Sequence, residues 1–313
     1  MLITLRETAD RLMAANSLIL TAHVNPDGDA IGSCLGLKFL LEAMGKRVQV
    51  IIDDDIPKFL NIMPGIEEIK KPVEESYEAD YLVILDACLD RVGVLPEKCK
   101  APVLNIDHHG TNDELADYLY LDAESAATAE IIYRLAKALG IRFDKDSATA
   151  VYIGLATDSG YFKYSNTTPH TMRAAAELME TGIRPEKISE AIETKDFSVI
   201  QGMAKALQTV ELFADGKVAG VFLDHELTSS LDNTEGFIDL IRVIDGVDVS
   251  VVLKAVEPEV CRVSMRSKVT DVSLIAAGMG GGGHKRAAGC TIKMPFAEAK
   301  KYLMSEILKA LEV

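Results

Sequence analysis

The chain has 313 residues, of which 48% are hydrophobic and 26% charged, so it can bury a sizeable core and is too long for one average domain. Its formal net charge of -15 argues against binding long or duplex nucleic acid by neutralising many phosphates. The cysteines show no C-x-x-C spacing, no run approaches the roughly 20 apolar residues of a membrane helix, and the charged N-terminal segment is unlike a secretory signal. We therefore expect a cytoplasmic, two-domain protein without membrane contact.

The first 190 residues alternate short apolar runs with helical patterns. Strands are predicted at SLILTAH, RVQVII, ADYLVILDA and APVLNID. Helical patterns follow in AIGSCLGLKFLLEAMG and SAATAEIIYRLAKALG, which Gly45 and Gly140 close. Such alternation is typical of an α/β fold with a mostly parallel sheet that helices cover on both faces.

From Asp196 the pattern changes to one long helix that runs into a strand, DFSVIQGMAKALQTVEL. An ADGK turn, strand-like KVAGVFLD, VDVSVVLKAV and VCRVSMRS, a glycine-rich turn and a closing helix from Phe296 complete the chain. We predict a first domain over residues 1–190, a connecting helix over 191–209, and a smaller α/β domain over 210–313.

Ionisable side chains stand where several of the predicted elements end. They are His23, Asp27 and Asp29 after the first strand, Asp86 after the third, Asp107, His108 and His109 after the fourth, and Asp158 at the end of the helix TAVYIGLATDSG. Since ligands of doubly wound sheets gather outside the carboxyl ends of strands, we expect these groups to converge. Converging carboxylates repel one another and need a strong positive charge, which divalent metal ions supply.

Two ions are more natural than one, because Asp27 and Asp29 can point at different ions. Imidazole and carboxylate ligands without thiolate favour Mn²⁺, with Co²⁺, Fe²⁺, Zn²⁺ and Mg²⁺ left open. Taken alone, the first loop also fits an ordinary polar turn in which Asp29 caps a helix that starts at Ala30. An EF-hand is excluded, because Ala30 stands where glycine is needed and Gly36 where glutamate is needed.

A second landmark is AAGMGGGGHKRAAG, which satisfies G-x-G-x-x-G from Gly278 to Gly283. A dinucleotide fold is rejected because a helical pattern precedes the glycines, and a Walker motif because His284 follows Gly283. A flexible turn is the simple interpretation. However, His284, Lys285 and Arg286 place cations beside exposed backbone N–H groups, which favours phosphate binding.

Together these motifs resemble the DHH phosphoesterases, a family named for the triplet that stands here as Asp107-His108-His109. The similarity includes HVNPDGDAIGS, the Asp86 motif and ATDSGYF, then SMRS and GGGGHKRAAG of a DHHA1-type domain, and it covers nearly the whole chain. It implies a DHH domain, a smaller DHHA1-type substrate-binding domain, and an active site in the cleft between them.

The resemblance also assigns roles to individual residues. It gives one Mn²⁺ to His23, Asp27 and Asp86, and a second to Asp29, Asp86, His108 and Asp158, so that Asp86 bridges. It places His109 at the reacting phosphate, to stabilise phosphoryl charge or protonate the leaving oxygen, and has Asp107 orient a histidine or its loop. It has a terminal phosphate or nucleotide held by Arg266 and His284, with Arg262, Gly282 and Gly283 beside them.

Within the family, the similarity is to enzymes that hydrolyse very short oligoribonucleotides and 3′-phosphoadenosine 5′-phosphate. It implies two-metal activation of a water and no covalent enzyme intermediate. A cyclic or linear dinucleotide phosphodiesterase, an inorganic pyrophosphatase and a non-catalytic, metal-dependent nucleotide-binding regulator remain alternatives. We expect the chain to act alone or as a homodimer.

Overall fold

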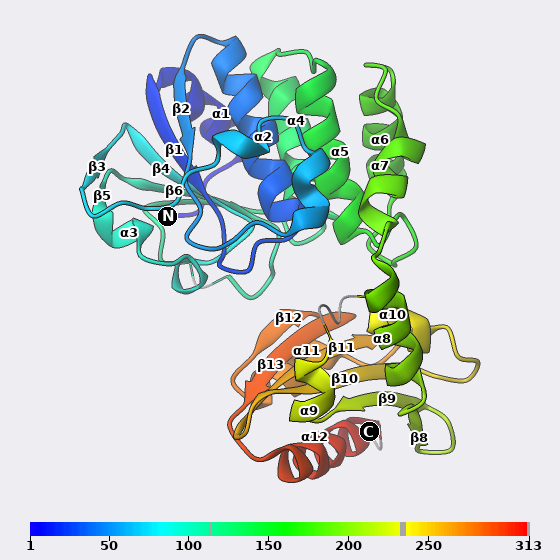
Figure 1. Cartoon of the computed structure of the whole chain (residues 1–313). Helices are drawn as coiled ribbons and strands as arrows, with labels where there is room; N and C mark the ends of the chain where they lie inside the picture. Colours follow the sequence, from blue (N-terminus) through cyan, green and yellow to red (C-terminus); the bar gives the residue numbers. More distant parts are fainter. Residues whose placement is uncertain (113, 232–235, 312–313) are drawn as a thin grey trace. The chain divides into compact units, whose positions relative to one another are not determined.

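The computed structural model describes residues 1–112, 114–231 and 236–311, and it divides into two compact units, Met1–Thr194 and Lys195–Val313. Figure 1 shows the elements of both units in chain colours. The predicted boundary after residue 190 lies inside helix α7 (Pro185–Glu193). The connecting helix predicted over 191–209 corresponds to α8 (Phe197–Leu207).

The first unit is built on a five-stranded sheet in the order β2-β1-β4-β6-β7, in which every pair is parallel. The strands are β1 (Ser17–Thr21), β2 (Arg47–Val50), β4 (Tyr81–Leu85), β6 (Val103–Asp107) and β7 (Tyr118–Leu121). The first four were predicted, whereas the short, half-buried β7 was not. The order changes direction between β1 and β4, so their carboxyl ends form a switch point where ligands commonly bind.

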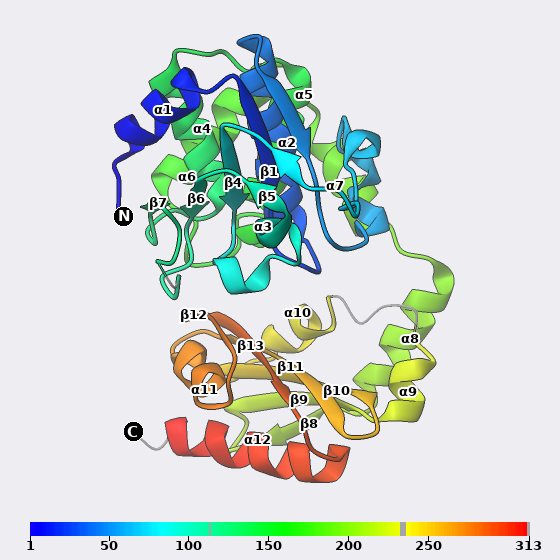
Figure 2. The same ribbon diagram turned by 90° about the vertical axis from the view of Figure 1, so that its left-hand side faces the viewer.

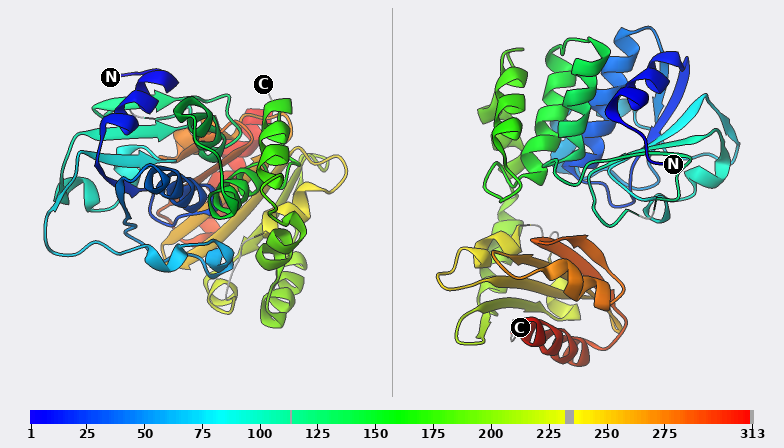
Figure 3. Two further views of the ribbon diagram at one scale, coloured as in Figure 1. Left: turned by 90° about the horizontal axis from the view of Figure 1, so that it is seen from above. Right: turned by 180° about the vertical axis from the view of Figure 1, so that it is seen from behind.

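Helices cover one face of this sheet (Figures 1 and 3). Helices α2 (Gly28–Ala43) and α4 (Thr128–Leu139) lie against the strands, and α1 (Leu5–Ala14) packs beside α4. Helices α5 (Lys145–Asp158) and α6 (Pro169–Met179) form a further layer outside them, and α7 packs against residues 58–62. Helices α2 and α5 pack closely because Gly32 has no side chain: a Cβ there would lie 2.5 Å from the carbonyl oxygen of Ala150. In the described part of the chain, no helix has the length and apolar content needed to cross a bilayer.

The other face was expected to carry helices as well, but it carries only short segments (Figure 1). Leu82 and Ile84 of the sheet pack there against Val92, Leu95 and Cys99. The segments are β3 (Tyr77–Glu78), η3 (Leu89–Arg91), α3 (Leu95–Lys98) and β5 (Cys99–Lys100). The 3-10 turns η1 (Lys58–Ile62) and η2 (Ile66–Glu68) lie earlier in the chain.

The second unit contains a six-stranded mixed sheet in the order β12-β13-β11-β10-β9-β8. The strands are β8 (Glu211–Phe213), β9 (Val218–Leu223), β10 (Val249–Glu257), β11 (Val260–Ser267), β12 (Gly282–His284) and β13 (Ala287–Ile292). The sequence predicted a glycine-rich turn where β12 lies. This prediction was wrong, because tertiary pairing with β13 extends a segment of low intrinsic strand propensity.

Helices pack on both faces of the second sheet (Figure 2). Helices α11 (Val272–Gly278) and α12 (Phe296–Leu311) cover one face, and α8 and α10 (Phe237–Arg242) cover β9 and part of β10 on the other. Helix α9 (His225–Ser229) follows β9. The strands β11, β13 and β12 therefore keep partly exposed side chains on the face opposite α12.

Candidate active site

The carboxyl ends of neighbouring parallel strands bring the ionisable side chains of the first unit together. Strand register places the ends of β1 and β4, and of β4 and β6, side by side. The proposed ligands account for two of the groups whose potential ligand atoms lie within 4.8 Å of one another, namely His23 with Asp27 and Asp86, and Asp29 with His108 and Asp158. The structure thus brings together all the side chains that the sequence proposed as metal ligands.

Asp86 lies between the two groups. Its Oδ2 is 3.6 Å from Nε2 of His23, and its Oδ1 is 3.4 Å from Nε2 of His108. The residue is buried, and its φ of 59° gives it the left-handed conformation that non-glycine residues rarely adopt. This sharp turn directly after β4 aims the carboxylate at both groups, which is the arrangement that a bridging ligand needs.

Asp27 and Asp29 have different structural roles at the start of α2. Asp27 is the N-cap, since its Oδ1 accepts the N–H groups of Asp29 and Ala30, each at 3.0 Å. The alternative in which Asp29 caps a helix from Ala30 is therefore wrong. The helix begins at Gly28, so Asp29 lies in its first turn and is available to other elements.

Asp29 is held by α4 and by its own helix. Its Oδ2 accepts the N–H of Thr128 at 2.6 Å, and its Oδ1 accepts the N–H of Ala129 at 2.8 Å and the hydroxyl of Ser33 at 3.1 Å. The positive N-terminal end of α4 thereby stabilises a buried carboxylate. The sequence analysis missed Thr128, because its contact with Asp29 spans 99 residues and leaves no local pattern.

His109 forms a pair with the fully buried Asp107. Nδ1 of His109 lies 2.8 Å from Oδ1 of Asp107, which also accepts the backbone N–H groups of His108 and His109. Asn112 donates to Oδ2 of Asp107 at 2.6 Å and to the side chain of Asn105 at 2.9 Å. The sequence analysis did not identify either asparagine, although Asn112 holds the carboxylate of Asp107 and Asn105 holds Asn112.

Burial and the neighbouring carboxylates act in opposite directions on the pKa values of His23 and His108. Burial alone lowers the pKa of His23, but the hydrogen bond to Asp86 and the charges of Asp27 and Asp86 raise it to about 9. Burial also opposes protonation of His108, yet Asp86, Asp158 and Asp29 hold its pKa well above the ordinary value. Without bound cations, these imidazoles therefore keep protons that partly neutralise the carboxylates.

The pKa values of three of the carboxylates are shifted as well, two of them upward and one downward. Burial raises the pKa of Asp29 well above its ordinary value and that of Asp158 to about 6, and neighbouring carboxylates add to both shifts. Burial acts the same way on Asp86, but hydrogen bonds from His108 and His23 lower its pKa well below the usual range. Two divalent ions would relieve this excess of negative charge, and the nitrogen and oxygen donors suit them.

In the second unit, Arg266 and His284 lie in one row of the sheet. Arg266 pairs with Ala287 across β11 and β13, and Ala287 pairs with His284 across β13 and β12. Directly paired residues point to the same side of a sheet, which here is the face opposite α12. Arg262 shares this face but pairs with Thr291, four positions along β11.

Gly282 and Gly283, which precede His284, differ in whether their position has room for a side chain. Gly283 has a φ of 135°, and a Cβ there would lie 2.5 Å from the carbonyl oxygen of Ala287. Gly282 has open space within 4 Å of the position its Cβ would take. Gly283 therefore permits the close pairing of β12 with β13, whereas Gly282 leaves the backbone accessible.

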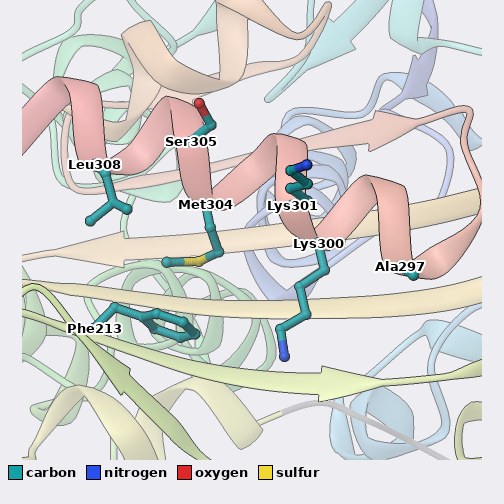
Figure 4. Close-up of a pocket in the computed structure, with 7 residues that line it drawn as sticks. All are labelled: Phe213, Ala297, Lys300, Lys301, Met304, Ser305 and Leu308. Carbon is teal, nitrogen blue, oxygen red and sulfur yellow. The ribbon is translucent and has the colours of Figure 1, made fainter.

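A separate surface depression of about 490 Å³ lies between β8 and α12 (Figure 4). Phe213, Met304 and Leu308 form its apolar part. Lys300 at its edge is paired with Glu211 at 2.6 Å and stands over the ring of Phe222 at 4.1 Å. The residues that line it include no predicted site residue, so we assign it no part in the active site.

Comparisons with known proteins agree with the two units. Residues 17–155 match the DHH family, N-terminal domain, and residues 215–312 match the DHHA1 domain. The chain is 37% identical over 291 residues to the bifunctional oligoribonuclease and PAP phosphatase NrnA of Thermus thermophilus, covering 92% of this chain and 88% of that one. The protein of the same name from Bacillus subtilis is 26% identical, covering 88% and 90%.

A solved structure has a similar fold over nearly the whole chain. The crystal structure of an exopolyphosphatase-related protein from Bacteroides fragilis matches with a TM-score of 0.85 and 27% sequence identity. The match covers 98% of this chain and 95% of that chain.

Proposed function

The chain belongs to the DHH family of phosphoesterases and carries a DHHA1 domain, and from this premise we propose that it hydrolyses very short oligoribonucleotides and 3′-phosphoadenosine 5′-phosphate with two divalent metal ions, foremost Mn²⁺. The observation that carries the proposal is the position of Asp86 between two groups of ligands. One ion would be held by His23, Asp27 and Asp86, and the other by Asp29, Asp86, His108 and Asp158.

When bound there, two divalent ions supply charge neutralisation and an activated water for in-line attack on phosphorus. His109 serves as the general acid toward the leaving oxygen. In the metal-free protein, burial lowers its pKa, but the hydrogen bond to Asp107 and the charge of Asp86 outweigh burial and raise the pKa above the ordinary value. The bond to Asp107 does not depend on bound ions, and it favours a protonated imidazole. Asp107 engages Nδ1, so Nε2 is the nitrogen that transfers the proton.

On the second unit, the row of Arg266 and His284 suits a terminal phosphate, because a guanidinium and an imidazole project from the same side of the sheet. Gly282 lets a phosphate approach the backbone beside them. Arg262 extends the same face toward the next part of the substrate.

A panel of substrates with Mn²⁺ tests the proposal. We expect hydrolysis of 3′-phosphoadenosine 5′-phosphate and of di- to pentaribonucleotides, with products separated by chromatography. The Asp86→Asn variant is the matched control, and it should lose both turnover and the binding of two ions, because the amide cannot serve both groups. Hydrolysis confined to cyclic dinucleotides or to pyrophosphate would contradict the proposed substrates, and nucleotide binding without turnover would favour the regulator.

A further inference from the structure

A threonine outside the proposed ligand set touches both ligand groups. Thr128, the first residue of α4, is fully buried. Its N–H donates to Oδ2 of Asp29 at 2.6 Å, and its Oγ1 donates to Oδ1 of Asp86 at 3.1 Å. One residue therefore fixes an oxygen of two carboxylates that come from α2 and from the end of β4.

Both of these oxygens face the same imidazole. Nε2 of His108 lies 3.8 Å from Oδ2 of Asp29 and 3.4 Å from Oδ1 of Asp86. The other oxygen of Asp86, Oδ2, faces His23 instead. Thr128 consequently stands behind the group of Asp29, His108 and Asp158, and not behind the group of His23 and Asp27.

The start of α4 is itself held rigidly. Oε2 of the buried Glu130 accepts the N–H of Ala126 at 3.0 Å and the hydroxyl of Thr171 at 3.0 Å. On the other side, α5 leaves no room, since a Cβ on Gly154 would lie 2.8 Å from Cβ of Ala129 and 3.0 Å from Oδ1 of Asp29. The first turn of α4 is therefore packed tightly against α5 beside Asp29.

The hydroxyl of Thr128 has no part in starting the helix. The N-cap residue Ala127 makes no side-chain cap, and Asp29 accepts the first N–H groups of α4 in its place. The hydroxyl goes to Asp86 alone among the bonds described. A purely structural role for Thr128 would be met by its backbone N–H, so the side chain requires another explanation.

We propose that Thr128 is a positioning residue for the metal ion held by Asp29, Asp86, His108 and Asp158, and that it leaves the ion of His23 and Asp27 almost unaffected. The inference rests on the proposed two-ion centre. Residues behind metal ligands typically change metal affinity by about 10- to 100-fold when they are removed. We expect the lower end, because the N–H of Thr128 remains when only its hydroxyl is lost.

The test uses Thr128→Val, which keeps the shape and the backbone N–H, in two proteins that retain one ion each. Asp27→Asn keeps the N-cap of α2 but weakens the ion at His23, and Asp158→Asn weakens the ion at His108. Calorimetric titration with Mn²⁺ should show about a tenfold affinity loss on adding Thr128→Val to Asp27→Asn, and less than twofold on adding it to Asp158→Asn.

Thr128→Ser is the conservative control, and it should restore affinity to within about twofold because it keeps the hydroxyl. Without metal, the proteins with threonine, valine or serine at position 128 should unfold at similar thermal midpoints. Unchanged affinity in Thr128→Val, equal losses in both backgrounds, or failure of the serine to rescue would overturn the role of Thr128. A wild-type protein that binds fewer than two ions would contradict the two-ion centre itself.

Discussion

The imidazoles of the site carry protons that metal ions must displace. The pKa of His23 lies at about 9, and that of His108 is raised well above its ordinary value, so both are charged near neutral pH in the absence of metal. A divalent ion binds only the neutral imidazole, and metal binding is therefore coupled to proton release. At the residue scale, the site exchanges bound protons for bound cations.

This exchange predicts that rising pH lowers the stability of the metal-free protein and raises its affinity for Mn²⁺. A raised histidine pKa contributes stability that is complete below pH 6.5 and is lost as pH rises through about 9, so the metal-free protein should become less stable across this range. Mn²⁺ affinity should rise over the same range, by about tenfold per pH unit for each displaced proton. Calorimetry in buffers of different ionisation enthalpy counts those protons. An affinity that stays constant from pH 6.5 to 9 would contradict the coupling.

The proposed roles of His109 and Arg266 predict different kinetic defects. His109→Ala should lower kcat by about 100-fold or more with little change in KM, because the imidazole acts in the reacting step. Arg266→Ala and His284→Ala should chiefly raise KM, since these residues are proposed to hold a phosphate other than the reacting one. Arg262→Ala is the control on the same sheet face, and we expect a smaller rise in KM because it lies in another row. Steady-state kinetics on 3′-phosphoadenosine 5′-phosphate measures all four variants, and the reverse pattern would exchange the roles.

At the scale of elements, pairing of the strand β12 carries a glycine-rich segment into the proposed phosphate-binding surface. Its three residues pair with β13 and carry His284 into the row of Arg266. The pairing brings Gly283 against the backbone of Ala287 and Ala288. The position of His284 thus depends on Gly283, whose lack of a side chain lets β12 approach β13.

Two neighbouring alanine substitutions separate this role from general flexibility. Gly283→Ala should destabilise the protein by about 1–3 kcal/mol, because it strains a positive φ and places a Cβ against the backbone. It should also raise KM by displacing His284, while Mn²⁺ binding by the first unit is retained. Gly282→Ala, which meets open space, should leave stability nearly unchanged. Urea unfolding of both variants checks the difference, and equal stabilities would contradict the assignment.

At the scale of the whole molecule, we expect the net charge to limit the length of the substrate. Lysine and arginine number 33 against 48 aspartates and glutamates, which gives the net charge of -15. Each phosphate beyond those proposed to contact Arg266, His284 and the metal ions would meet a protein with a net negative charge. Additional nucleotides therefore add little binding energy and some repulsion.

We accordingly expect kcat/KM to fall beyond roughly four or five nucleotides, and added salt to weaken activity less steeply than in a basic nuclease. A series of oligoribonucleotides from dimers to 20-mers, measured at two salt concentrations, tests both expectations. Equal or rising efficiency toward the 20-mers would indicate a processive exonuclease instead.

The sequence by itself determined the elements and the chemistry that depend on neighbouring residues. Periodic apolar runs located four strands of the first sheet, and the polar residues at their ends identified the groups around Asp86, because parallel strands share one carboxyl edge. The resemblance to the DHH family added the roles proposed for His109, Arg266 and His284. These inferences needed only short-range patterns and motif order.

Only the tertiary structure decided how separate segments meet. It showed that Asp27 caps α2 while Asp29 turns to α4, that Thr128 joins Asp29 to Asp86, and that Asn112 holds Asp107. It also showed that the end of the glycine-rich segment forms the strand β12. Such contacts link residues up to 100 positions apart. Hydrophobic periodicity carries no information about which distant backbone group will satisfy a buried carboxylate.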